Sequence, residues 1–230
     1  MSEKNLQSLR EAVGRDRYPG RGIIVGTTPD GRAVYAYFIM GRSENSRNRI
    51  FEQREDGLYT VPFDASKVAD PSLILYRAIG TYGNCTAVTN GDQTDTILAA
   101  LAAGGTFESA LRTRVFEPDT PNYTPRISAV LEGDGSYKMG ILKAADAEGK
   151  ACLRQFFEYP AIPGVGHFLH TYACDGNPLP SFEGEPETVA IPNDAETLVA
   201  ELWDALDAEN KISLCVSVGG KTYVKNKNGG

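Results

Sequence analysis

The feature that most constrains the fold is a long series of short apolar runs, rich in β-branched and aromatic residues and separated by turn-forming residues. Runs of this length and composition predict β-strands. The first two are separated by Pro29-Asp30-Gly31, which favours a tight turn and therefore a hairpin. The predicted strands cover residues 21–28, 32–41, 49–54, 58–63, 72–79, 84–89, 126–132, 136–143, 151–158, 166–173, 187–191, 212–218 and 221–225.

Helices are fewer. Helical spacing of apolar residues predicts a short helix over 3–13 and a longer one over 194–208. Residues 92–103 begin with acidic side chains and end before two glycines, which also predicts a helix, and residues 106–115 are a weaker candidate. Hairpin-linked strands with a few helices predict an α+β domain with largely antiparallel sheets whose faces the helices cover.

Composition excludes several classes of protein. The chain has 230 residues, 41% of them hydrophobic and 23% charged, which is ordinary for a globular protein and atypical of a disordered or fibrous one. Its longest apolar runs are far shorter than the roughly 18 residues that span a bilayer. The N-terminus mixes charges and lacks the apolar core of a secretory signal, so we expect a cytoplasmic protein. Four scattered cysteines without C-x-x-C spacing are interpreted as buried small hydrophobic residues.

The net charge of −7 is unevenly distributed. Residues 1–54 hold 10 Lys and Arg against 6 Asp and Glu, although the whole chain has 23 against 30. An acidic chain with a local arginine cluster is poorly suited to nucleic acid and well suited to a small anion such as a phosphate. A solvated charged face is the alternative explanation of the same composition.

Two motifs are rejected in context. Gly219-Gly220-Lys221-Thr222 resembles the end of a phosphate-binding loop, but position 214, where the first glycine is required, is a leucine. A Gly-Gly hairpin turn is the better interpretation. His167 and His170 are the only histidines, and three residues apart in a strand they point to opposite faces. We therefore expect no metal site and no cofactor.

Three loops are candidates for ligand binding. Gly41 to Arg49 follows an apolar strand and offers Arg42, Arg47 and Arg49 to an anion; a solvated turn is the alternative. The turn at Asn90 and Gly91 joins a strand to a helix. Asp92 and Asp95 are expected to satisfy the positive helix end, so this turn is expected to bind ribose hydroxyls or an amide rather than a phosphate. Gly91 is expected to take a positive φ, and simple helix capping is the alternative interpretation of the segment.

The third candidate is the proline-rich segment 116–126, whose three prolines stiffen the chain around Glu117, Asn122 and Arg126. A stiff loop can hold polar groups in a fixed geometry for catalysis. A rigid crossover connection would have the same composition.

Taken in order, these segments resemble the archaeal-type inosine monophosphate (IMP) cyclohydrolase family. The resemblance covers residues 18 to about 143 and provides no motif for 144–230. The matching pieces are Tyr18-Pro19-Gly20-Arg21-Gly22, Gly41-Arg42-Ser43 with Arg47-Asn48-Arg49, Leu75-Tyr76-Arg77-Ala78-Ile79, Thr89-Asn90-Gly91-Asp92-Gln93-Thr94-Asp95, and Glu117 before Asn122-Tyr123-Thr124-Pro125-Arg126-Ile127.

The resemblance implies an N-terminal nucleophile (Ntn) hydrolase-like fold: a four-layer αββα sandwich of two mostly antiparallel sheets. We expect one such domain over 18–230, preceded by an N-terminal extension over 1–17. Members of that hydrolase superfamily use an N-terminal Cys, Ser or Thr as nucleophile, whereas Gly20-Arg21 opens the first strand here. The implied reaction is dehydrative closure of the purine ring of 5-formamidoimidazole-4-carboxamide ribonucleotide, which gives IMP and water in de novo purine biosynthesis.

The site residues follow from the matched motifs. The predicted catalytic residues are Arg42, Tyr76 and Glu117, with Glu117 and Tyr76 chosen for proton transfer because histidine is scarce. We expect a small purine ribonucleotide as substrate, a homo-oligomer, and no nucleic acid or membrane partner; a separate formyltransferase partner is left open. The predicted substrate-binding residues are Arg21, Ser43, Arg47, Asn48, Arg49, Asn90, Gly91, Asp92, Thr94, Asp95, Asn122 and Arg126.

Two other functions stay open from the sequence alone. A nucleotide-binding module could keep the same pocket without turnover, and an amidohydrolase could act on another small amide. Turnover of the formylated ribonucleotide separates the first from the cyclohydrolase. N-terminal processing that exposes a nucleophile identifies the second.

Overall fold

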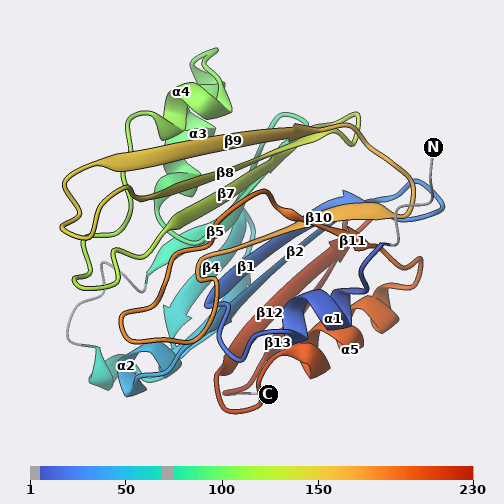
Figure 1. Cartoon of the computed structure of the whole chain (residues 1–230). Coiled ribbons are helices and arrows are strands. Elements are labelled where there is room, and N and C mark those ends of the chain that lie inside the picture. Colours follow the sequence, from blue (N-terminus) through green and yellow to red (C-terminus); the bar gives the residue numbers. More distant parts are fainter. Residues whose placement is uncertain (1–5, 69–74, 230) are drawn as a thin grey trace.

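The structure, a computed structural model, describes residues 6–68 and 75–229, and it contains two stacked antiparallel sheets between helical layers (Figure 1). Every strand pairing between neighbours within the sheets is antiparallel. The first sheet has the order β11-β10-β1-β2-β12-β13, with β1 Arg21–Thr27, β2 Ala33–Met40, β10 Val165–His170, β11 Glu187–Ala190, β12 Lys211–Val218 and β13 Lys221–Asn226.

The second sheet runs in chain order from β3 to β9 and is therefore a meander. The four-layer α+β sandwich expected from the sequence is confirmed by these two sheets and the helices outside them. Its strands are β3 Arg49–Arg54, β4 Gly57–Pro62, β5 Tyr76–Tyr82, β6 Cys85–Thr89, β7 Arg126–Leu131, β8 Tyr137–Ala144 and β9 Cys152–Tyr159.

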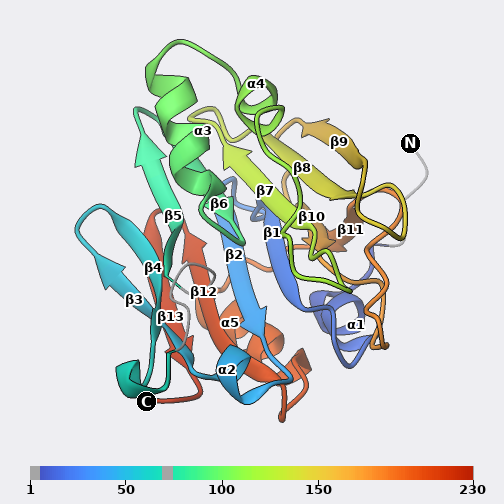
Figure 2. The same ribbon diagram turned by 90° about the vertical axis from the view of Figure 1, so that its left-hand side faces the viewer.

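The helices form the two outer layers (Figures 1 and 2). Helices α1 and α5 lie side by side on the outer face of the first sheet, and α3 and α4 cover the outer face of the second. A short α2 and a 3-10 turn, η1, lie beside β3 and β4. Their bounds are α1 Leu9–Gly14, α2 Glu44–Arg47, η1 Ala65–Lys67, α3 Gln93–Ala102, α4 Phe107–Leu111 and α5 Ala195–Ala205.

Three apolar clusters hold the layers together. The middle cluster lies between the sheets and includes Ile23, Tyr37 and Ile127, all fully buried. One outer cluster joins the first sheet to α1 and α5, and the other joins the second sheet to α3 and α4. The segment before residue 18, expected as an extension, contributes Leu9 and Val13 to the first of these outer clusters.

Several predicted boundaries need correction. The first helix begins at Leu9 because Ser8 caps it, accepting from the backbone N–H of Glu11; residues 3–5 of the predicted helix lie outside the described residues. The predicted strand 72–79 has its first three residues outside the described range and is observed from Tyr76. The helical turn α2 and the shortness of α4 were not predicted.

Gly20 connects the segment before β1 to the first residue of that strand. Its φ is +79°, and a Cβ there would lie 2.3 Å from Thr171 Oγ1 and 2.5 Å from the Tyr172 ring. The backbone N–H of Arg21 in turn donates to Thr171 Oγ1 over 3.1 Å. The glycine therefore permits the close approach that fixes the start of β1.

We expect Gly20→Ala to destabilise the fold more than Gly31→Ala does. Both glycines have positive φ, but nothing lies within 4 Å of a Cβ at Gly31. Gly31→Ala should therefore cost only about 1–2 kcal/mol for the left-handed backbone, and Gly20→Ala about 1–3 kcal/mol more for steric overlap. Urea unfolding of the two variants measures the difference; equal losses would contradict the close packing at Gly20.

Candidate active site

The candidate site lies at one end of the sandwich, where several strands begin with polar residues on their inward faces. In β1, Arg21 alternates with the inward-facing Ile23, so its side chain also points between the sheets. The same alternation with apolar residues of the middle cluster directs Arg49 of β3 inward. Tyr37 and Tyr76 are themselves members of that cluster. Four polar residues from both sheets therefore face one another.

Two guanidiniums are held in this interior. Arg49 is 2% exposed, and its Nε donates to the Ser46 carbonyl over 2.8 Å. Burial and the neighbouring Arg21 both lower the pKa of Arg49, although a guanidinium stays protonated at neutral pH. The Nε of Arg21 is buried and has no hydrogen-bond partner among the described residues. The site thus contains two cations, one with an unsatisfied donor.

Nearby groups compensate the positive charge of Arg21. Burial on its own lowers the pKa of Arg21, but the opposing effects of Glu117 and of the tyrosines Tyr172, Tyr18 and Tyr76 raise it overall. Glu117 is the only carboxylate among those groups. Its side chain is therefore the electrostatic partner of the buried guanidinium.

Glu117 lies in the loop between α4 and β7 and is 7% exposed. Its backbone N–H donates to the Thr124 carbonyl over 2.9 Å, which closes the loop. Within the described chain, no hydrogen bond or ion pair of its carboxylate is observed, so it acts on Arg21 without direct contact. Burial raises the pKa of Glu117, and Arg21 and Arg126 oppose that rise only in part. The carboxyl group is thus shifted toward its neutral form.

Tyrosines form the rest of the site. The hydroxyls of Tyr37 and Tyr76 lie 2.9 Å apart and connect the two sheets. The Tyr172 hydroxyl lies 2.6 Å from Thr124 Oγ1, and burial raises the pKa of Tyr172 to about 12. The raised pKa values of Tyr37 and Tyr172 keep these two phenols protonated near neutral pH. Phenol hydroxyls can donate hydrogen bonds to a ligand or to one another.

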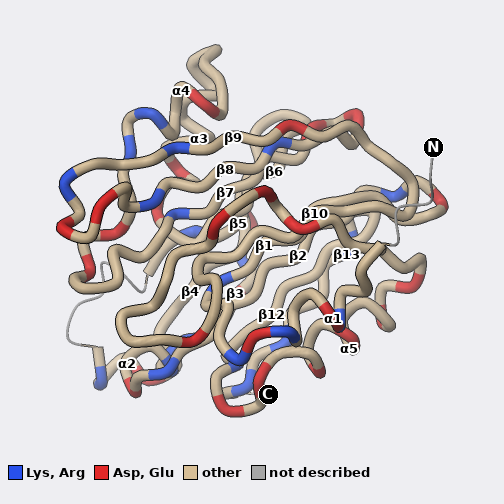
Figure 3. Tube along the Cα trace, in the orientation of Figure 1, with Lys and Arg blue, Asp and Glu red and all other residues tan. Residues whose placement is uncertain are grey.

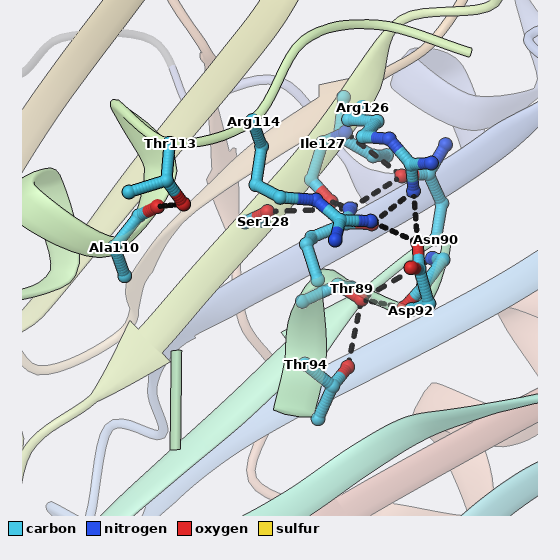
Figure 4. A network of polar contacts seen from close by, with 12 residues as sticks. Thr89, Asn90, Asp92, Thr94, Ala110, Thr113, Arg114, Arg126, Ile127 and Ser128 are labelled. Atoms are coloured by element: carbon cyan, nitrogen blue, oxygen red, sulfur yellow. Dashed lines mark hydrogen bonds and ion pairs between the residues drawn. The ribbon is translucent and has the colours of Figure 1, made fainter. Parts of the chain in front are cut away.

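The turn between β6 and α3 is built from internal hydrogen bonds (Figure 4). The Asn90 amide donates to the Pro125 carbonyl over 2.8 Å, and its oxygen accepts from the backbone N–H of Ile127 over 2.9 Å. The hydroxyls of Thr94 and Thr89 lie 2.7 Å apart. Of these two predicted substrate-binding residues, Asn90 therefore fixes the turn against β7, and Thr94 joins the first turn of α3 to β6.

Asp92 pairs with two arginines at the same turn. Arg126 Nη1 donates to Asp92 over 2.7 Å, and Arg114 reaches the same carboxylate oxygen (Figure 4). Asp92 occupies the N-cap position of α3, but its side chain makes no capping hydrogen bond, so the alternative of simple capping does not hold for this side chain. Its carboxylate accepts from Arg126 and Arg114 instead. Asp95 pairs instead with Arg77 on β5, where Nε lies 2.8 Å from the carboxylate.

Position 91 requires a glycine, but not for the predicted reason. Its φ is not in the left-handed region, so the prediction of a positive φ is wrong. A Cβ at this position would lie 2.5 Å from Arg126 Nη1 and 2.6 Å from Gln93 Oε1. The group that needs this space is the Arg126 guanidinium.

The arginines of the 41–49 segment do not converge. Arg49 points between the sheets, whereas Arg42 lies at the rim over the Tyr18 ring and pairs with Asp175 over 2.5 Å. Arg47 donates to the Gly41 carbonyl over 3.0 Å and contacts Asn210.

Three other predicted binding residues also have structural contacts. Ser43 caps α2. The Asn48 side chain donates to the Asp64 carbonyl over 2.8 Å, and Asn122 accepts from the backbone N–H of Leu179 over 3.0 Å. These bonds fix the segments that surround the site.

The two histidines have different hydrogen-bond partners, and the four cysteines differ in burial. His167 bonds the Tyr137 hydroxyl over 2.6 Å, and His170 contacts the Tyr172 carbonyl and Glu187, so the two rings face opposite sides of β10 as predicted. The interpretation of all four cysteines as buried is wrong: Cys215 is buried, Cys174 is exposed and the other two are intermediate. The described residues contain no group of His, Cys, Asp or Glu arranged to hold a metal ion.

Comparison with known proteins places this chain in a family. A family model described as "IMP cyclohydrolase-like protein" matches residues 18–222. The chain belongs to this family. The IMP cyclohydrolase of Methanococcus aeolicus is 30% identical over 161 residues, which cover 68% of this chain and 75% of that protein. The IMP cyclohydrolase of Methanocaldococcus jannaschii is 27% identical over 213 residues, which cover 90% and 96%.

The family match includes residues that sequence reasoning did not single out. Tyr37, Tyr172 and Arg114 contribute to the site or its supports. Tyr37 could have been found from alternation, because it shares a strand face with Ile39 that points into the middle cluster. Tyr172 and Arg114 fall within the predicted strand 166–173 and the predicted helix 106–115, but β10 ends at His170 and α4 at Leu111. Both residues therefore lie in irregular segments, where periodicity does not determine the direction of a side chain.

We expect Glu117→Gln to stabilise the ligand-free protein near neutral pH. Since the pKa of Glu117 is raised, the folded chain binds this proton more tightly than the unfolded chain, and ionisation destabilises the fold. The penalty is absent below the unfolded pKa of about 4.3 and grows as pH rises through the folded pKa. Thermal unfolding at pH 4 and pH 7.5 measures the effect.

The exposed Glu158→Gln is the matched control and should change the unfolding temperature little at either pH. A Glu117→Gln variant that is less stable than wild type at pH 7.5 would contradict the account of a carboxylate destabilised by burial.

Proposed function

We propose that the open end of the sandwich closes the purine ring of 5-formamidoimidazole-4-carboxamide ribonucleotide to give IMP and water. The family match and relatives named IMP cyclohydrolase support the activity. One observation carries the assignment to this site. The guanidiniums of Arg21 and Arg49 point inward near the buried carboxylate of Glu117, and within the described residues neither forms an ion pair with it. Such charges are arranged for a ligand rather than for one another.

The reaction needs charge stabilisation and proton transfer. The carboxamide nitrogen attacks the formyl carbon, a C–N bond forms, and negative charge develops on the formyl oxygen. That oxygen then leaves as water, whose two hydrogens come from the carboxamide and formamide nitrogens. The protein must align the two substituents, stabilise the oxyanion and move these protons.

The residues at the site can supply each of these functions. Arg21 and Arg49 provide fixed positive charge for the oxyanion, in an interior where electrostatic interactions are stronger than in water. Glu117, with its raised pKa, suits acceptance of the nitrogen proton and its later return. Tyr76, whose hydroxyl faces the same interior, suits donation toward the departing oxygen.

Residues at the rim are assigned to binding. Arg42, predicted as catalytic, lies over Tyr18 and is partly exposed, so we place the 5′-phosphate of the substrate beside it. Arg126 is oriented by Asp92 and Gln93 and acts electrostatically on Glu117. We assign it to holding the purine precursor against the proton-transfer groups. The remaining predicted binding residues support the loops that carry these groups.

The proposal also includes the location, the assembly and the substrate supply of the protein. Among the described residues, no helix combines the length and apolar character needed to cross a bilayer. Charges of both signs are mixed over the molecule, as expected for a partner that is a small metabolite (Figure 3). A cytoplasmic homo-oligomer that receives its substrate from a formyltransferase is part of the proposal, tested by sedimentation and by copurification.

We expect purified wild-type protein to convert the formylated ribonucleotide to IMP in an ultraviolet assay. Glu117→Gln and Tyr76→Phe should each lower kcat about 100-fold or more with little change in KM, since each removes a proton-transfer group and keeps its shape. Arg49→Ala should lower kcat/KM, because a charge-assisted hydrogen bond to the transition state is lost. The loss of transition-state stabilisation should be on the order of 1.5–3 kcal/mol.

Glu108→Gln is the control for these variants, because Glu108 pairs with Lys138 on the outer face of the second sheet. It should retain wild-type kinetics. Wild-type kcat in both Glu117→Gln and Tyr76→Phe would remove these residues from the mechanism, and absence of turnover in the wild type would refute the proposed activity.

We also expect turnover to need neither a divalent metal nor a thiol. Burial, with Glu132, raises the pKa of Cys85 to about 11, and burial raises that of Cys215 to about 12, so both remain unreactive thiols near neutral pH. Activity should survive excess EDTA and treatment with iodoacetamide at pH 7.5. A loss on chelation that zinc or magnesium restores would contradict this mechanism.

A further inference from the structure

The contact between Tyr37 and Tyr76 has a geometry that the reaction can use. Tyr37 lies on β2 of the first sheet and is fully buried, while Tyr76 opens β5 of the second sheet and is 7% exposed. Their hydroxyl oxygens lie 2.9 Å apart, within hydrogen-bond distance. The tilted ring of Phe51 packs on Tyr37 with centroids 5.4 Å apart. Tyr37 therefore presents its hydroxyl to Tyr76 from a fixed position.

Only certain groups can receive the two phenolic protons. The charged neighbours that act on Tyr37 are Arg21 and Arg49, which are donors and cannot accept a proton. In the described chain, the hydroxyl of Tyr76 is the hydrogen-bond partner observed for Tyr37. A buried hydroxyl without an acceptor costs free energy, so the Tyr37 proton is best satisfied when it points at the Tyr76 oxygen.

The direction of this bond determines what Tyr76 can do. When the Tyr76 oxygen accepts from Tyr37, its own proton must point elsewhere. Tyr76 is 7% exposed whereas Tyr37 is fully buried, so the Tyr76 proton is the one that can reach a ligand. Burial and Tyr76 raise the pKa of Tyr37 well above its ordinary value, so Tyr37 keeps its proton. Acceptance of this bond also stabilises the Tyr76 oxygen as it becomes negative.

We propose that Tyr37 is a positioning residue for ring closure: it donates to the Tyr76 oxygen, turns the Tyr76 proton toward the substrate and stabilises Tyr76 after that proton has left. This role rests on the proposed function of Tyr76 as proton donor. Tyr37 itself has no direct contact with the reacting atoms. Its effect must therefore pass through Tyr76.

The test is a double-mutant cycle on kcat and KM with Tyr37→Phe, Tyr76→Phe and the double variant. We expect Tyr37→Phe to lower kcat about 5–15-fold, the value of one hydrogen bond of about 1–1.5 kcal/mol, with KM within about twofold of wild type. In the double variant, kcat should equal that of Tyr76→Phe alone, because Tyr37 has no partner to act on once the Tyr76 hydroxyl is gone.

Tyr137→Phe is the matched control, since Tyr137 is also buried between the sheets and also loses one hydrogen bond, to His167. It should lower the unfolding temperature as much as Tyr37→Phe and leave kcat unchanged. IMP binding measured by calorimetry on the wild type and all four variants checks that each folds with an intact site.

The outcomes separate the two claims. Turnover in the wild type with unchanged kcat in Tyr37→Phe, or with effects of the two substitutions that multiply in the double variant, overturns the role of Tyr37 alone. A fall in kcat for Tyr137→Phe equal to that for Tyr37→Phe also overturns it, because general loosening of the core would then explain both. Absence of turnover in the wild type refutes the proposed function.

Discussion

The structure depends on holding charged groups between two apolar sheets without pairing them directly. Arg49 and Glu117 are almost fully buried, and a buried charge is costly unless another group compensates it. Arg21 and Glu117 offset each other electrostatically, and no hydrogen bond or ion pair between them is observed in the described chain. Opposite charges that are removed from water and not bonded to each other can interact with a polar ligand more strongly than they would in solution.

The rest of the fold maintains this arrangement. Gly20 lets β1 begin close to Thr171 and Tyr172, which sets the position of Arg21. The internal hydrogen bonds of Asn90 join the start of α3 to β7 and so orient Arg126. Apolar clusters on both faces of each sheet supply the stability that offsets the cost of the site. Rigid strands thus carry the charges, and short loops adjust their directions.

Much of the architecture could be predicted from residue periodicity. The run 49–54 matches β3 residue for residue, and the Gly219-Gly220 turn joins β12 to β13 with positive φ at both glycines. Strand patterns are reliable here because one face of nearly every strand packs on an apolar layer. Short elements such as α2 were missed because four residues carry no periodicity and depend on the local cap at Ser43.

The candidate site was less predictable than the fold. A cluster of three arginines in 41–49 suggested a single anion site, yet only Arg49 lies on an inward strand position, while Arg42 and Arg47 bond to other loops. The direction of each side chain depends on where β3 begins, which composition does not determine. Tyr37 looked like a core residue, and it is one; its function arises from the hydroxyl that it presents to Tyr76 across the two sheets.

The most direct test of the central claim is a crystal structure of the protein with IMP bound. The account predicts the six-membered ring of IMP between the two sheets, with its newly closed edge within hydrogen-bond distance of Glu117 and Tyr76 and beside Arg21 and Arg49. IMP bound elsewhere, for example in the cavity of about 640 Å³ between α1 and α5, with the buried charges left without a ligand, would contradict it.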